Sequence, residues 1–230
     1  MVGPTDDRSG SSAAVGPINI ADGIPVHRMQ PPGLEGITAY GLDAPPALCV
    51  MTAVLGGFGP PPDLVVSGIN RGPNTGASVL HSGTVGAALA AANFDVSAVA
   101  VSLYWGEPSF LGTAAEVAAS SLGWLGGEPA GTVLNVNVPN RALSDVVGVC
   151  EASLARFGEV RVAMREGESD PPVLEISGDG ERSAGEGTDT AMLAAGYVTV
   201  TALVGGRAAP PTSAPKAMAE ALLGVGGSPD

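Results

Sequence analysis

Residues 64–92 constrain the fold more than any other part of the chain. Residues 64–69 form a continuous apolar run that leads into Asn70, and a polar loop follows. An alanine-rich run then begins after Ser82, Gly83 and Thr84. An apolar run bounded by turn residues predicts a buried parallel strand, and a capping serine before small residues predicts a helix start. A strand, a polar loop and a helix start are how α/β folds build an anion site.

The remaining patterns predict an α/β fold in which residues 64–69 are a central strand. The other predicted main strands are 96–103, 132–138 and 197–203. The predicted helices are 47–55, 84–92, 114–125 and 214–223. Alternation of strands and helices predicts a parallel sheet with covering helices. Shorter strands are predicted within 24–40 and, in a β-rich excursion from the core, at 146–151, 160–164 and 173–177.

The length of 230 residues suits one domain with a sizeable core. Apolar residues make up 45% of the chain and charged residues 14%, which is typical of a folded protein. We therefore interpret residues 1–230 as a single domain. Its core covers about 1–140 and 187–230, and a β-rich segment at about 141–186 protrudes from it.

The formal net charge of −13 excludes one class of partner. Duplex nucleic acid is bound by cationic side chains that displace counterions, so we expect no duplex nucleic acid as a partner. A small phosphorylated ligand is compatible with this charge, because backbone N–H groups and a divalent cation can hold it.

Two cysteines, Cys49 and Cys150, lie among apolar residues and are predicted to be free thiols rather than a disulfide. No apolar run reaches membrane-spanning length, and the first residues include Asp6, Asp7 and Arg8 rather than an apolar leader. We therefore expect a cytoplasmic protein with no membrane partner.

Asn70 is a candidate ligand for a hard cation, since its amide oxygen follows a strand at the edge where α/β folds bind ligands. The alternative is an asparagine that caps its own loop. Asn74, Ser82, Gly83 and Thr84 are candidate phosphate contacts, and plain helix capping is the alternative for them. Ser9 alone would be an ordinary turn serine.

Two sequence strings resemble the signature of the SurE family, the survival-protein-E nucleotidases. They are the segment from Pro62 to Asn74, which contains Ser67-Gly68-Ile69-Asn70-Arg71-Gly72-Pro73-Asn74, and the segment from Leu80 to Ala88. Other strings are similar to further blocks of that family: Val2-Gly3-Pro4, Arg8-Ser9-Gly10, Leu134-Asn135-Val136-Asn137-Val138-Pro139 and Gly187-Thr188-Asp189.

This resemblance implies a Rossmann-like three-layer sandwich and a metal-dependent 5'-nucleotidase of the acid-phosphatase type. The substrate would be a nucleoside 5'-monophosphate and the cofactor Mg²⁺ or Mn²⁺. Ser9 and Asn70 would be metal ligands, and Asn74, Ser82, Gly83 and Thr84 would bind phosphate. The resemblance also implies a homodimer or homotetramer, with His81 at the rim of the site.

The chain departs from the family pattern in one chemically important respect. The family's Asn-Asp-Asp-Gly motif, which supplies two anionic metal ligands, does not occur in this sequence. By comparison with the family, its first strand and first helix are missing, and no catalytic residue is identified. The alternative function is therefore a truncated or degenerate SurE-like protein that binds nucleotide or phosphate without turnover. A third possibility is an α/β scaffold with no ligand.

Overall fold

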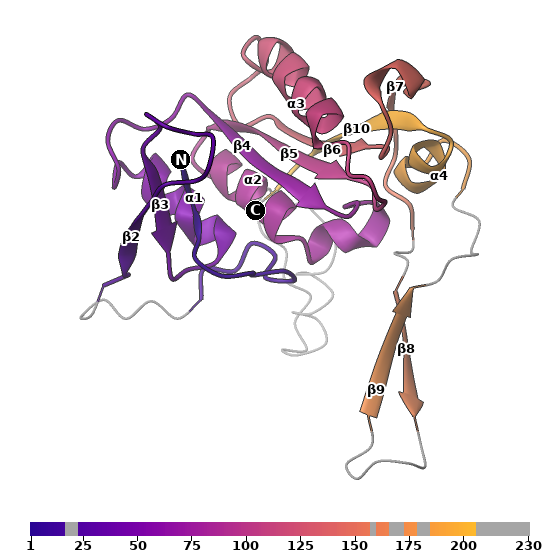
Figure 1. Ribbon diagram of the computed structural model, residues 1–230, viewed down its shortest axis with the longest axis horizontal. Coiled ribbons are helices and arrows are strands. Elements are labelled where there is room, and N and C mark those ends of the chain that lie inside the picture. Colours follow the sequence, from indigo (N-terminus) through magenta and orange to yellow (C-terminus); the bar gives the residue numbers. More distant parts are fainter. Residues whose placement is uncertain (17–22, 157–159, 166–172, 179–184, 206–230) are drawn as a thin grey trace, which may run out of the picture.

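The computed structural model describes residues 1–16, 23–156, 160–165, 173–178 and 185–205. Two sheets and a separate hairpin account for all of the strands in these ranges. The largest sheet has five strands in the order β4-β5-β6-β10-β7 (Figure 1). These strands are β4 (Leu64–Arg71), β5 (Ser97–Leu103), β6 (Val133–Val138), β7 (Gly148–Glu151) and β10 (Tyr197–Leu203).

Alternation of side chains along β5 gives this sheet two apolar faces. Val99 and Val101 pack with Ala114 of helix α3 (Leu111–Leu125) on one face. Ala98 and Ala100 pack on the other face against α2 (Gly83–Ala92). Alanines on both surfaces allow α2 to approach the sheet closely. The two helices therefore cover opposite faces, and the large sheet lies between them as a three-layer sandwich (Figure 1).

The N-terminal part of the chain forms a smaller sheet of its own, with the order β1-β3-β2. Its strands are β1 (Val2–Pro4), β2 (Val26–Met29) and β3 (Ala39–Leu42). The helix α1 (Pro46–Val54) begins after Pro45 and contributes Leu48 and Cys49 to a small core with Leu42. Helix α1 also packs along α2, which joins the small sheet to the large one.

The remaining elements are short. Two 3-10 helices, η1 (Gly76–Leu80) and η2 (Leu143–Asp145), lie in loops, and α4 (Asp189–Ala194) precedes β10. The strands β8 (Val160–Arg165) and β9 (Val173–Gly178) pair only with each other and project away from the sheets (Figure 1). None of the helices in the described ranges is long and apolar enough to span a membrane.

The structure confirms the α/β class and most predicted elements, and it corrects two predictions about the sheet. The sheet is not wholly parallel, because β10 runs antiparallel to β6. The strand at 64–69 is not central, since β4 pairs only with β5 among the described strands and Val66 is 51% exposed. A continuous apolar run predicts a buried strand, but it does not reveal how many strands flank it. The helix predicted at 214–223 lies outside the described residues.

Candidate functional site

A bulge near the end of β4 sets the position of Asn70. The register with β5 shifts between Ser67 and Asn70, and Asn70 then lies opposite Ser102. Gly68 has a φ of +123°, and a Cβ there would overlap the carbonyl oxygen of Val101. Only glycine fits this backbone without displacing β5, and a bulge of this kind re-aims the side chains that follow it. The sequence string around Gly68 therefore places Asn70 at the carboxyl end of the sheet.

The Asn70 side chain is half-buried and makes two contacts. Its Nδ2 donates a hydrogen bond to the carbonyl oxygen of Gly72 at 2.7 Å, so it does cap its own loop. Its Oδ1 accepts a long hydrogen bond of 3.4 Å from Thr84 Oγ1. An amide oxygen has two lone pairs, and one remains open to a further donor or to a cation. Loop capping and ligand binding are thus compatible at this residue.

Ser9 lies on an exposed loop that is organised by Asp7. The carboxylate oxygen Oδ1 of Asp7 accepts hydrogen bonds from the Ser9 backbone N–H at 2.8 Å and from Ser9 Oγ at 2.6 Å. These two bonds, the side-chain one first, lower the pKa of Asp7 below its ordinary value. Ser9 therefore keeps its oxygen lone pairs free, with an ionised carboxylate beside it at neutral pH.

The start of α2 presents backbone donors, as expected for an anion site. Ser82 caps the helix, since its Oγ accepts a hydrogen bond from the Val85 N–H at 3.1 Å. The N–H groups of Gly83 and Thr84 have no acceptor within the described part of the chain. Free N–H groups and the positive end of the helix dipole together favour an anion at this point.

The loop that carries Ser9 packs against this helix start. A Cβ on Gly83 would lie 2.9 Å from Ser11 Oγ and 3.5 Å from the carbonyl oxygen of Arg8. Ser12 reinforces the contact by donating from its Oγ to the Leu80 carbonyl oxygen at 2.6 Å. Ser11 Oγ is shielded from solvent and has no hydrogen-bond partner within the described residues. Ser9, Gly83, Thr84 and Asn70 therefore belong to one contiguous region.

Asn74 has different surroundings from the other candidates, because it is buried in a polar network. Its Nδ2 donates to Ser102 Oγ at 2.7 Å, and its N–H donates to Asn137 Oδ1 at 2.7 Å. Its carbonyl oxygen accepts from Asn135 Nδ2 at 2.8 Å and from Asn137 Nδ2 at 3.1 Å. These bonds fix the loop that follows β4. Among the other candidates, Ser9 is exposed and Asn70 and Thr84 are half-buried, whereas Ser82 and Gly83 are buried at the helix start.

Sequence reasoning missed the role of Asp189. This residue is fully buried, and its carboxylate accepts backbone N–H bonds from Gly76, Ala155 and Thr190 at 2.8, 3.0 and 2.8 Å. It therefore ties η1 to α4 and to the chain after β7. The sequence did indicate that Asn135 and Asn137 make buried hydrogen bonds, because a buried strand that alternates valine with asparagine must pair those amides inside the protein.

The described residues do not form a complete metal centre. They contain no group of three or more His, Cys, Asp or Glu side chains that could hold a metal ion. Ser9 and Asn70 offer two neutral oxygens, and a hard divalent cation in a protein is bound mainly by carboxylates with such oxygens as additional ligands. This donor pair alone does not fit the metal.

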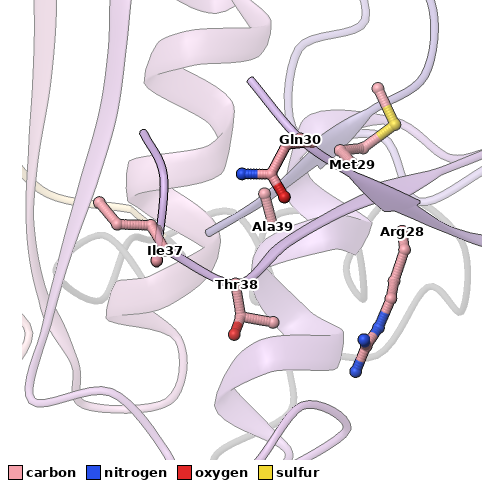
Figure 2. A pocket seen from close by; sticks show the side chains of 7 residues that line it. Arg28, Met29, Gln30, Ile37, Thr38 and Ala39 are labelled. Atoms are coloured by element: carbon pink, nitrogen blue, oxygen red, sulfur yellow. The ribbon is translucent and has the colours of Figure 1, made fainter. Parts of the chain in front are cut away.

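Two hollows of similar volume lie at different places in the fold. One of about 210 Å³ lies at the end of the β2–β3 ladder, where Arg28 and Gln30 come from one segment and Ile37 and Thr38 from the other (Figure 2). It contains none of the predicted site residues. The other, of about 220 Å³, is lined by Arg71, Gly72 and Trp105 and directly adjoins Asn70.

A sheet covered on both faces by helices, with free backbone N–H groups at a helix start that follows an edge strand, defines a Rossmann-like α/β protein. A family model described as "Survival protein SurE" matches residues 1–163. The 5'-nucleotidase SurE of Aeromonas hydrophila is 35% identical over 207 residues, covering 88% of this chain and 80% of that protein. The 5'/3'-nucleotidase SurE of Edwardsiella ictaluri is 36% identical over 212 residues, covering 88% and 78%.

A solved structure agrees with these relatives. The crystal structure of the SurE protein from Aquifex aeolicus superposes with a TM-score of 0.69 at 25% identity, covering 88% of this chain and 80% of that one. The chain therefore belongs to the SurE family. Nucleotidases of this family are metal-dependent.

Proposed function

We propose that this protein hydrolyses nucleoside 5'-monophosphates to the nucleoside and inorganic phosphate. One observation carries the proposal: the start of α2, Asn70 and the Ser9 loop meet at the carboxyl end of β4. The relatives that bear the name 5'-nucleotidase support the same reaction. The phosphoryl group would lie on the free N–H groups of Gly83 and Thr84, where a dianion is favoured.

The other candidates have distinct roles in this proposal. Ser82 fixes the direction of the N–H groups by capping α2. Asn74 holds the loop that follows β4 in place through its buried bonds. Ser9 and Asn70 supply neutral oxygen ligands to a divalent cation, Mg²⁺ or Mn²⁺. Because these two residues lack a carboxylate partner of the family type, we assign Asp7, which is hydrogen-bonded to Ser9, as the anionic group beside that cation.

Binding without turnover is the alternative function, and the relatives that bear the name 5'-nucleotidase do not favour it. Phosphate release from a panel of nucleoside monophosphates, with Mn²⁺ or Mg²⁺ added, separates the two functions. We expect release that falls sharply in Asn70→Ala and persists in Ser120→Ala, an exposed serine on α3. Binding of the nucleotide with no release by the parent protein would support the alternative instead.

We also propose that the protein acts as a homodimer or homotetramer. The outer edge of β4 has no partner strand in the described ranges, and unpaired edges recruit other chains. Exposed apolar side chains on the β7 side, including Val147 and Val149 at 54% and 69% exposure, supply further contact area. Sedimentation velocity tests this proposal, and a stable monomer at high protein concentration would contradict it.

The remaining proposals concern the surroundings of the protein. Free Cys49 and Cys150 suit the reducing cytoplasm, where disulfides do not persist. The net charge of −13 opposes duplex nucleic acid as a partner. A salt-independent failure to bind DNA in a filter assay is the expected result.

A further inference from the structure

The hollow beside Asn70 adjoins the phosphate region through a single turn. Arg71 ends β4, and the Gly72 N–H donates a hydrogen bond to the Leu103 carbonyl oxygen at 2.8 Å. The Gly72 carbonyl oxygen accepts the bond from Asn70 Nδ2 at 2.7 Å. The backbone of Gly72 therefore separates the two regions. The hollow has a volume of about 220 Å³. Because one water occupies roughly 30 Å³ in the liquid, the hollow has room for several waters or for one planar heterocycle.

Trp105 forms an aromatic wall of this hollow. Its side chain is 57% exposed, which leaves much of the indole surface available for contact. A Cβ on Gly72 would lie 2.7 Å from Trp105 Nε1, so the glycine allows the indole to rest against the backbone. The Tyr104 ring lies 5.5 Å from the indole, centroid to centroid, and is tilted by 59°. The indole is thus supported on one side and open on another.

The loop around Trp105 is anchored, so the indole is held in position before a ligand arrives. The Tyr104 N–H donates to the Val138 carbonyl oxygen at 2.8 Å. Asn140 accepts from the Phe110 N–H at 2.8 Å and donates to the Pro108 carbonyl oxygen at 3.1 Å. A large aromatic side chain that is exposed yet held by a fixed loop loses little conformational freedom on binding.

Arg71 and Glu107 give the same hollow a donor and an acceptor. Both residues are exposed, and neither takes part in an ion pair found in the described part of the chain. A guanidinium only donates hydrogen bonds and an ionised carboxylate only accepts them. The ring nitrogens and exocyclic amine of a nucleobase present the complementary groups.

We propose that Trp105, Arg71 and Glu107 form the subsite for the nucleobase, with the base stacked on the indole. This proposal rests on the proposed nucleotidase function, because the base must be joined to a phosphate held at Gly83 and Thr84. Purines bind more tightly than pyrimidines here, since the larger ring system covers more of the indole.

The test compares substrates with and without a base. The substrates are adenosine 5'-monophosphate and ribose 5-phosphate. We expect Trp105→Ala to lower kcat/KM for the nucleotide about tenfold, the effect of losing one base–aromatic stack. The value for ribose 5-phosphate should stay within about twofold, and Trp105→Phe should be intermediate for the nucleotide. Equal losses on both substrates, or no loss on the nucleotide, would overturn the subsite.

A binding experiment keeps this inference independent of turnover. The chain has two tryptophans, so a Trp124→Phe variant leaves Trp105 as the only indole fluorophore. Adenosine should quench its fluorescence saturably, and Arg71→Ala should weaken that binding. If the parent protein hydrolyses neither substrate but adenosine still quenches Trp105, the proposed function fails and the subsite stands. No saturable quenching by adenosine removes the subsite even if both substrates are hydrolysed.

Discussion

The surroundings of Asn74 and of Asn70 differ sharply, although only a short loop separates the two residues. Asn74 is 7% exposed and belongs to a buried network with Ser102, Asn135 and Asn137. Asn70 is half-buried and lies on an open edge with Thr84 and the Ser9 loop. Buried polar groups that hydrogen-bond to one another favour one conformation, whereas polar groups at a surface that keep an open lone pair can bind a ligand. The network therefore fixes the loop, and the open edge is where we propose that the ligand binds.

The largest effect on stability should come from Asp189→Ala, which removes the buried acceptor for three backbone N–H groups, among them that of Gly76 in the loop after Asn74. We expect the free energy of unfolding to fall by about 3 kcal/mol, because buried donors lose a charged acceptor. Urea denaturation measures this change. Asp145→Ala is the matched control, since Asp145 is exposed and should change stability by less than about 0.5 kcal/mol. Similar losses in both variants would contradict the role of Asp189.

A pair of asparagine variants tests the comparison directly. Asn70→Ala should reduce nucleotide hydrolysis by about a hundredfold, as for loss of one positioned polar group in an active site. Its stability should hardly change, because Asn70 is half-buried. Asn74→Ala should instead lower the free energy of unfolding by about 1 kcal/mol through the lost bond to Ser102.

Activity assays and urea denaturation on both asparagine variants provide the measurement. The comparison fails if Asn70→Ala is the less stable variant, or if Asn74→Ala leaves stability unchanged.

The open edge could be predicted from the sequence more fully than the network. Local sequence patterns were sufficient to predict β4, the cap at Ser82 and the helix that follows, because capping and strand signals act within a few residues. The contact of the Ser9 loop with Gly83 and the bonds of Asp189 to Gly76 join residues far apart in the chain. Such contacts depend on how the elements pack, and no local pattern specifies them. The edge position of β4 was mispredicted for the same reason.

Ser82→Ala tests whether the helix start is preorganised for an anion. Removing the cap should cost about 1 kcal/mol of stability and weaken phosphate binding, because the Val85 N–H loses its acceptor. Thr188→Ala is a matched control at the start of α4, where the capping bond to the Ala191 N–H is longer, at 3.4 Å. Thermal unfolding and competition by inorganic phosphate measure the two effects. Weakened phosphate binding in Thr188→Ala alone would place the anion elsewhere.

The smallest expected signal concerns metal binding at the open edge. Calorimetric titration with Mn²⁺ should show no tight site, because Ser9 and Asn70 are neutral and Asp7 is the only carboxylate bonded to Ser9 among the residues that the structure describes. The hydrogen bonds from Ser9 lower the pKa of Asp7, so the carboxylate stays ionised to a lower pH than an ordinary aspartate. Any weak binding should therefore persist at and above the ordinary pKa of aspartate and disappear only as the pH falls through the lowered pKa of Asp7. Asp7→Asn should abolish it, and Asp145→Asn should leave it unchanged. A tight one-to-one isotherm that survives Asp7→Asn would show that other carboxylates complete the site.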